Sequence, residues 1–447
     1  MKTFFSFIPA VFLPALLFLS GAYFLCRLCR YFLPGRLFPA LRRGARTGAG
    51  ALSLALAGTL GVGNIVGVAG ALSAGGPGAL FWMVVAAFLA MSLKYAEVTL
   101  GMAHRTADAA GRFHGGAPYY IRSVFRGRTG RVLSAFFALL MFAAMLTLGG
   151  VVQSHAAAEG LFRVFGWPPA LTGALLALAV LLVLWRGGGK PERVTAWLIP
   201  FLCVLYVAVT VFLLWRRREA LPAALSAVFS GAFSGRSATA GILGFLWSGA
   251  VRYGVSRGLV SNEAGCGSTP TAHATAGGVE PARQGLLGIA EVFVDTVLLC
   301  SLTGLALLVG GGAPAAGSDG MAWVLSAYGS ALGPLAGPFI SLSVLAFAFA
   351  TLLCFSHYGT ESVYFLSGGR KKGAGFVFPA LVCSVFAGAL LSPAPLWALT
   401  DVILALMTFL NLTALFFARK EIGALSADFF IREEGKGGRE RKRKNAA

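Results

Sequence analysis

Glycines and one asparagine interrupt an apolar stretch near the start of the chain. Residues 57–82 read AGTLGVGNIVGVAGALSAGGPGALFW, with Gly61 and Gly63 just before Asn64. Glycine lets the backbone leave helical geometry, and in a membrane the freed N–H and C=O groups must be buried in protein or line a wet cavity. Discontinuous helices of this kind form substrate and ion sites in secondary transporters. Close packing of helices through small residues explains the glycines equally well at this point.

Other polar side chains lie inside apolar runs further along. The Gln153 amide is able to donate to a carboxylate and accept from an ammonium, although hydrogen bonding between helices is the alternative. Thr351 and Phe355 are four residues apart and share a helix face. A hydroxyl beside an aromatic wall suits a small zwitterion, but a bond from threonine to its own helix is the more common role. Lys94 and Glu97 are three residues apart and predict a local ion pair.

Two carboxylates lie one helical turn apart in the run EVFVDTVLLC. Intramembrane carboxylates are candidates for cation ligands, proton relays or ion-pair partners. For Glu291 we expect a structural pair with Arg252 or Arg257. For Asp295, the roles of cation ligand, proton relay and ion-pair partner all remain open.

Sequence motifs of enzymes are weak or absent. Residues 254–258 read GVSRG and fit G-x-S-x-G around Ser256, but the strand–turn–helix setting of a nucleophile elbow is missing. Neither H-E-x-x-H nor the phosphate-binding G-x-x-x-x-G-K-[ST] occurs. We therefore expect no enzyme, and any energy for transport to come from an ion gradient. An ion channel and an intramembrane enzyme using Ser256 are the alternatives of other classes.

Composition places the chain in a membrane. Of 447 residues, 57% are hydrophobic and only 12% are charged, with a mean hydropathy of +0.77. Eleven apolar runs are long enough to span a bilayer, near residues 4–26, 51–73, 79–103, 132–159, 169–185, 195–215, 238–260, 285–309, 334–355, 374–392 and 395–418. The net charge of +20 lies mostly in loops and in the tail, which indicates membrane orientation rather than nucleic-acid binding.

The basic loops alternate with loops that carry little or no lysine and arginine. This pattern predicts an N-terminus outside the cell membrane and a basic cytoplasmic tail over 420–447. One loop disagrees, because Arg216, Arg217 and Arg218 fall on the outer side.

The spans divide into one extra N-terminal helix, 4–26, and two halves of five. The halves, 51–216 and 238–419, would then have opposite orientations within a single transmembrane domain, which is the inverted-repeat plan. The second and seventh spans correspond, and we expect the seventh to be broken at Ser248–Gly249 and again at Gly254. Two interrupted segments at corresponding positions indicate a binding site at the midplane of the membrane and favour transport.

Several collinear motifs resemble the alanine/glycine:cation symporter family, sodium-coupled amino-acid carriers with a LeuT-like core. They are VGNIVGV (62–68), GGPGALFWM (75–83), KYAEV (94–98), GGAPYYI (115–121), RGLVSNEAGCGSTPTAH (257–273) and FVDT (293–296). The resemblance implies an all-α polytopic fold of about eleven helices with a LeuT-like five-plus-five inverted repeat. It also implies symport of alanine or glycine with sodium by alternating access, the ion being co-transported rather than a resident cofactor.

The resemblance carries binding roles over to individual positions. The implied substrate-binding residues are Gly61, Val62, Gly63, Asn64, Gln153, Phe245, Ser248, Gly249, Thr351 and Phe355. Sodium would lie among carbonyls of the first broken helix, with Asn64 or Thr351 as a side-chain ligand.

Four positions depart from the family pattern. Val62 replaces a threonine, Gly150 and His155 replace two amides, and Phe355 replaces a tryptophan. The missing threonine hydroxyl and amide oxygens leave the identity and number of the co-transported cations open. The smaller ring of Phe355 predicts room for a substrate larger than alanine. His155 keeps a proton-coupled carrier, or one of broader specificity, as the alternative. The expected partners are a small neutral amino acid, sodium and the lipid bilayer.

Overall fold

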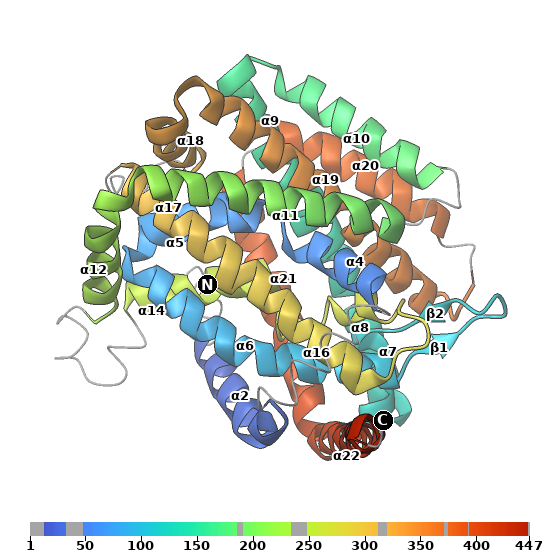
Figure 1. The fold of residues 1–447 in the computed structure, drawn as a ribbon. Coiled ribbons are helices and arrows are strands. Elements are labelled where there is room, and N and C mark those ends of the chain that lie inside the picture. The colour runs from blue at the N-terminus through green and yellow to red at the C-terminus, as the bar shows by residue number, and fades with distance from the viewer. Residues whose placement is uncertain are drawn as a thin grey trace.

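The fold is almost entirely helical (Figure 1). The computed structural model describes residues 13–32, 48–185, 191–233, 248–311, 320–370, 374–391 and 393–445. Within these residues the only strands are β1 (Thr106–Ala107) and β2 (Phe113–His114), a short antiparallel hairpin in which Thr106 pairs with His114.

The helices follow one another through short connections. In chain order they are α2 (Leu13–Leu28), α4 (Ala49–Thr59), α5 (Val66–Gly75), α6 (Gly78–Ala103), α7 (Ala117–Phe125), α8 (Gly127–Ala144), α9 (Gln153–Phe165), α10 (Pro169–Trp185), α11 (Pro191–Arg216), α12 (Leu221–Ala232), α14 (Gly249–Asn262), α15 (Pro270–His273), α16 (Pro281–Val292), α17 (Ser301–Gly310), α18 (Gly320–Leu332), α19 (Ala336–Leu366), α20 (Ala374–Leu390), α21 (Pro393–Phe417) and α22 (Arg419–Asn445). A π-helical turn over Met145–Val152 joins α8 to α9, and another over Phe293–Cys300 joins α16 to α17.

Seven helical segments in the described part of the chain are long and apolar enough to cross a membrane. They are Leu13–Tyr31, Gly78–Ala103, Gly127–Phe165, Pro191–Arg216, Pro281–Gly310, Gly320–Leu366 and Trp397–Phe417. Shorter apolar helices, among them α4 and α5, add to these. The predicted class, an all-α polytopic membrane protein, is confirmed, whereas the predicted number of eleven spans is not established. The boundaries of the two halves stay a prediction, and part of the seventh predicted span lies outside the described residues.

Helix α6 lies at the centre of the packing, between α14 and α16 (Figure 1). Glycines make these contacts close. A Cβ at Gly285 of α16 would lie 2.9 Å from the Tyr95 carbonyl oxygen, and one at Gly254 of α14 would lie 2.4 Å from the Ala79 carbonyl oxygen. Gly254 therefore serves helix packing.

The second interruption lies at a place that the sequence did not predict. Helix α14 runs unbroken from Gly249 to Asn262, so the predicted break at Gly254 is wrong. Ser248 is the N-cap of this helix, and because residues 234–247 fall outside the described residues, the break at Ser248–Gly249 stays a prediction. The helix ends at Glu263, which has φ +52°, and a non-helical segment follows up to α15. Gly265 and Gly267 take positive φ in this segment, a conformation that glycine adopts at little cost.

The C-terminal helix packs on the body of the protein. Ile422, Phe429 and Phe430 of α22 are buried, and Ser426 accepts a hydrogen bond of 2.9 Å from the Tyr95 hydroxyl of α6. The start of the segment predicted as a basic tail, 420–447, is thus packed against α6.

A buried histidine fastens the hairpin to the end of α19. His114 Nδ1 lies 2.9 Å from Glu361 Oε1, and the imidazole stacks on Tyr364 with 3.9 Å between ring centroids. Burial alone would lower the pKa of His114, but the hydrogen bond and negative charge of Glu361 outweigh it and raise the pKa.

This contact is expected to stabilise the protein in a pH-dependent way. A raised pKa makes the contribution complete below the ordinary value of about 6.5, and the contribution is lost as pH rises through the folded-state value. Thermal unfolding in detergent at pH 5.5 and pH 9 measures it, because the wild type should exceed His114→Gln in stability by more at the lower pH. A gap that widens toward pH 9 would contradict this assignment.

Candidate functional site

The first helix of the site is interrupted between α4 and α5. Gly61 has an extended conformation, with φ −132° and ψ −156°. A Cβ at this position would lie 2.8 Å from the Thr351 hydroxyl and 2.9 Å from Gln153 Oε1. Only glycine leaves room for both polar side chains to approach the backbone.

Gln153 and Thr351 hold this unwound segment from neighbouring helices. Gln153 Oε1 accepts the Val62 N–H at 3.1 Å, and its amide donates to the Leu148 carbonyl oxygen of the π turn at 3.3 Å. The Thr351 hydroxyl donates to the Phe347 carbonyl at 3.0 Å, within its own helix, and has a longer contact of 3.4 Å with the Leu60 carbonyl. Gln153 thus satisfies a backbone group that the broken helix frees.

Asn64 connects the unwound segment to a buried carboxylate. Its Oδ1 accepts the Gly61 N–H at 3.0 Å, while its amide donates to Asp295 Oδ1 at 2.6 Å. Asp295 also accepts hydrogen bonds from the Ser261 hydroxyl at 3.0 Å and the Thr296 hydroxyl at 2.6 Å. All of these polar side chains are buried. The unwound segment, α14 and the second π turn therefore meet at Asp295.

A small cavity lies where the two interruptions face each other. Its lining comes from both broken helices, the first π turn, Gln153 and α21, through Gly58, Thr59, Gly61, Gly63, Leu148, Gln153, Val260, Glu263 and Trp397. Three predicted substrate residues, Gly61, Gly63 and Gln153, are thus brought together. Sequence reasoning missed Val260 and Glu263, although both lie in the quoted motif RGLVSNEAG.

The remaining predicted substrate residues lie beside or away from this lining. Val62 is buried next to it, and Phe355 packs against Gly149, where a Cβ would lie 2.7 Å from the phenylalanine side chain. The extra room predicted from Phe355 is therefore not in the cavity. Gly249 lies against Ala74 at the start of α14, about 18 Å along the helix from Ser261.

Ser248 precedes Gly249 and caps the same end of α14. Neither residue lines the cavity bounded by Gly61, Gly63 and Gln153, and their role in substrate binding stays a prediction. Phe245 falls outside the described residues. The two residues predicted to bind sodium both lie against Gly61, and Asn64 also contacts Asp295; their role as ligands stays a prediction.

Comparison with known proteins identifies the relatives of this fold. The family model described as the sodium:alanine symporter family matches residues 10–444. The chain belongs to this family.

Its relatives include transporters of known and unknown substrate. An uncharacterized transporter of Haemophilus influenzae is 36% identical, over 86% of this chain and 83% of the relative. The sodium/alanine symporter AgcS of Methanococcus maripaludis is 34% identical, over 82% of this chain and 80% of the relative. YrbD of Bacillus subtilis, named a putative sodium/proton-dependent alanine carrier, is 31% identical, with 82% and 77% covered.

A solved structure shares the fold. The manganese transporter of Eremococcus coleocola superimposes with a TM-score of 0.54 at 15% sequence identity, covering 86% of this chain and 77% of that one. Family membership makes this chain a multi-pass membrane transporter, not an enzyme.

This symporter-family member also buries a network of charges between α6 and α16. Lys94 Nζ lies 3.3 Å from Glu291 Oε1 and 3.6 Å from Glu97 Oε1, and it donates to the Thr269 hydroxyl at 2.6 Å. Glu291 is also 2.8 Å from His273 Nε2. The local pair of Lys94 and Glu97 is confirmed.

The predicted partners of Glu291 are wrong. Arg257 instead lies 3.8 Å from Asp401, and Arg252 hydrogen-bonds to Tyr253. Pairing within one half of the chain was the natural inference from sequence, but α6 packs directly on α16 and supplies Lys94.

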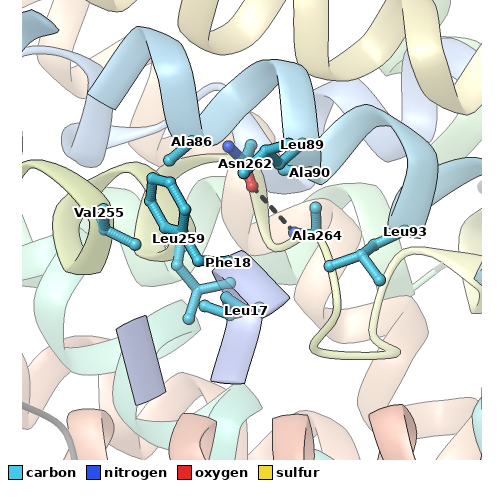
Figure 2. A pocket seen from close by; sticks show the side chains of 10 residues that line it. All are labelled: Leu17, Phe18, Ala86, Leu89, Ala90, Leu93, Val255, Leu259, Asn262 and Ala264. Atoms are coloured by element: carbon cyan, nitrogen blue, oxygen red, sulfur yellow. Dashed lines mark hydrogen bonds between the residues drawn. The ribbon is translucent and has the colours of Figure 1, made fainter. Parts of the chain in front are cut away.

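A second cavity lies between α2, α6 and α14 and is almost wholly apolar (Figure 2). Its one amide, Asn262, accepts the Ala264 N–H at 3.0 Å and donates to the Thr296 hydroxyl at 3.0 Å. Because this amide is already bonded, the cavity offers a polar substrate no free partner, and it is not the candidate site.

Proposed function

We propose that this protein is a secondary transporter that carries a small neutral amino acid, alanine or glycine first, together with sodium by alternating access. The observation that carries the proposal is the polar cavity between two interrupted helices, with Asn64 tied to a buried carboxylate beside it. The names of AgcS and YrbD support alanine as substrate and a cation as the driving ion.

The two ends of the broken helix suit a zwitterion. Helix α5 begins after Asn64, and the positive end of its dipole favours the substrate carboxylate. Helix α4 ends at Thr59, where its carbonyl groups favour a cation, and Gly58 and Thr59 line the cavity. We place the amino acid across this gap, bounded by Gly61, Gly63 and Gln153.

We place the sodium ion beside Asn64 and Asp295. A carboxylate together with hydroxyl oxygens suits a hard cation, and Asp295 supplies the carboxylate while Ser261 and Thr296 supply the hydroxyls. In this arrangement the ion and the substrate each complete the other's surroundings on opposite sides of one unwound segment. Coupling of this kind acts in both directions.

The proposal is tested by uptake of radiolabelled L-alanine into proteoliposomes. An inward sodium gradient is compared with choline in its place. Uptake that needs sodium is the expected result. Uptake that ignores sodium and follows a pH gradient would favour the proton-coupled alternative, and no uptake of alanine or glycine would overturn the substrate class.

Gln153→Ala is expected to lower sodium-driven uptake by about tenfold. The variant leaves the Val62 N–H without its acceptor, and an unsatisfied buried donor costs about 1–3 kcal/mol, which corresponds to roughly 5- to 150-fold. Initial rates at equal amounts of reconstituted protein measure the effect.

Ser341→Ala is the matched control for Gln153→Ala. It removes a buried hydrogen bond of 2.9 Å from α19 to the Gly160 carbonyl of α9, away from the cavity. Its uptake should remain near wild type, whereas equal losses in both variants would show that Gln153 acts only through helix packing.

A further inference from the structure

Among the described residues, Trp397 is the one aromatic side chain that lines the candidate substrate cavity. It lies near the start of α21, at one end of a segment long enough to span the membrane. Tryptophan at the end of a span is commonly an anchor at the membrane interface. Trp397 is instead partly buried, lines the cavity and has the Arg257 guanidinium over its ring. These surroundings are those of a wall of the cavity rather than of an anchor.

The cavity lining combines the unwound segment with large apolar side chains from other elements. The backbone of the unwound segment and the ends of α4 and α5 suit the charged groups of an amino acid. The large apolar side chains are Leu148 in the first π turn, Val260 in α14 and Trp397 in α21. A neutral substrate side chain has no charge to place at the unwound segment, so we expect it to contact these three residues.

Arg257 and Asp401 hold the Trp397 ring in place. The guanidinium carbon of Arg257 lies 4.9 Å from the ring centroid, and Arg257 Nη1 lies 3.8 Å from Asp401 Oδ1. Asp401 follows Trp397 by one helical turn on α21, so the arginine of α14 contacts two side chains on one face of α21. Movement of the ring would cost the attraction between the cation and the aromatic face. The ring therefore has a defined position.

A wall of defined position discriminates between substrates by size. One methylene group that a pocket does not accommodate changes the rate by about 10- to 200-fold. The glycines of the lining, Gly58, Gly61 and Gly63, have no side chain that could move aside. The indole of Trp397 is the largest side chain of the lining, so its removal would create more room than any other single truncation.

We propose that Trp397 determines substrate specificity, because its indole limits the substrate to amino acids with a side chain as short as that of glycine or alanine. Arg257 and Asp401 are the positioning residues that hold the indole. The inference rests on the amino-acid transport proposed above and names the residue that restricts the substrate class. The smaller ring of Phe355 does not relax this limit, because it packs against Gly149 outside the cavity.

The test compares initial rates of sodium-driven uptake of radiolabelled L-alanine and L-leucine in proteoliposomes, each far below saturation. In the wild type the rate for alanine should exceed that for leucine by at least about tenfold, the lower value for one excluded methylene. In Trp397→Ala this ratio should fall by at least about tenfold, because the space of the indole then accommodates the leucine side chain. The ratio compares two substrates on one preparation, so a loss of folded protein does not change it.

Trp215→Ala is the matched control. It also removes an indole with an arginine over its ring, since Arg218 lies 5.9 Å from the Trp215 centroid. Trp215 is 60% exposed on α11 and does not line the cavity. The ratio in this variant should equal that of the wild type. An equal fall in Trp215→Ala and Trp397→Ala would overturn the specific role of Trp397.

Arg257→Met tests the positioning of the ring. It removes the cation above the indole, and the ratio of alanine to leucine uptake should fall by about two- to fivefold, the value of one such contact. Arg257→Lys keeps a cation and should retain a ratio near that of the wild type. A purely structural role for Arg257 would lower the uptake of both amino acids without changing their ratio, and that result would overturn its positioning role.

A second readout does not require turnover. The midpoint of thermal unfolding is measured for purified protein in detergent and sodium, with alanine or leucine added, because a bound ligand stabilises the folded state. Alanine but not leucine should raise the midpoint of the wild type, and both should raise that of Trp397→Ala. If Trp397→Ala does not fold, Trp397→Phe, which keeps a smaller aromatic ring at the same place, should change the selectivity in the same direction by less.

The outcomes separate this inference from the transport proposal. A wild type that takes up leucine as fast as alanine, or a ratio that is unchanged in Trp397→Ala, overturns the role of Trp397 and leaves sodium-coupled transport standing. Absence of sodium-driven uptake overturns the proposed transport, and the thermal midpoints then decide the role of Trp397. If neither amino acid raises the midpoint of the wild type in that case, both proposals are wrong.

Discussion

Asn64→Ala is expected to reduce sodium-driven alanine uptake by about 30-fold or more while the protein remains folded. The variant leaves the Gly61 N–H without its acceptor and removes a hydrogen bond of 2.6 Å to Asp295. Two buried groups lose a partner, at a cost of about 2 kcal/mol or more. Because the Gly61 N–H and the Asp295 carboxylate both hold the unwound segment in place through Asn64, we expect the substitution to distort the geometry of the binding site. Initial uptake rates and the sodium concentration at half-maximal rate measure it.

Thr210→Val is the matched control for Asn64→Ala. Thr210 is equally buried, and its hydroxyl bonds with Tyr328 and the Tyr206 carbonyl in a cluster between α11 and α18. The substitution preserves shape and removes buried hydrogen bonds in which Asn64 takes no part. Both variants should elute as monodisperse protein, but only Asn64→Ala should lose uptake. Normal uptake by Asn64→Ala would remove this residue from the site.

Lys94→Met is expected to have the largest effect on stability, with a loss of about 3–5 kcal/mol. The substitution removes the one ammonium between Glu97 and Glu291, which leaves uncompensated charge in a fully buried region. We expect little folded protein, and a much lower midpoint of thermal unfolding for what is recovered. Fluorescence-detected size-exclusion chromatography after heating measures both.

Two further variants show whether charge is the cause. Lys94→Met combined with Glu291→Met replaces this pair by apolar side chains. It should recover part of the lost stability, because the charge of Glu291 is no longer left unpaired, although Glu97 still lacks its ammonium. Arg163→Met, at a partly exposed pair with Glu159, should cost no more than about 1 kcal/mol. A double variant as unstable as Lys94→Met would show that packing around the lysine stem matters more than its charge.

The part of the site in the unwound segment between α4 and α5 was predictable from sequence because each of its residues has a single structural role. Gly61 has to be glycine for the approach of Gln153 and Thr351, and Asn64 is a polar residue with no other reason to lie in an apolar stretch. The glycines in and after α14 have two roles. Gly254 permits close packing on α6, whereas Gly265 and Gly267 provide positive φ, and composition alone does not separate these uses.

The remaining differences between the predicted and the observed site arise from contacts between segments that are far apart in the sequence. The partner of Glu291 is decided by the packing of α16 on α6, and spacing along the chain carries no information about that contact. The displacement of Phe355 from the cavity follows from the same limit, because Gly149 on another helix receives its ring. Local patterns thus predicted the first break, but neither the position of the break after α14 nor the side chains that the breaks bring together.

The two π turns make the helices around the cavity less rigid. A π-helical turn is wider than an α-helical one, and such turns are frequent at functional sites. Helical segments on either side of the turn are able to rotate against each other about it, whereas a continuous α-helix moves as a rod. The first turn ends just before Gln153 and the second contains Asp295, the two side chains that hydrogen-bond to the unwound segment. We therefore expect a change in the cavity to reach α8 and α16 as a rotation about these turns rather than as a displacement of whole helices.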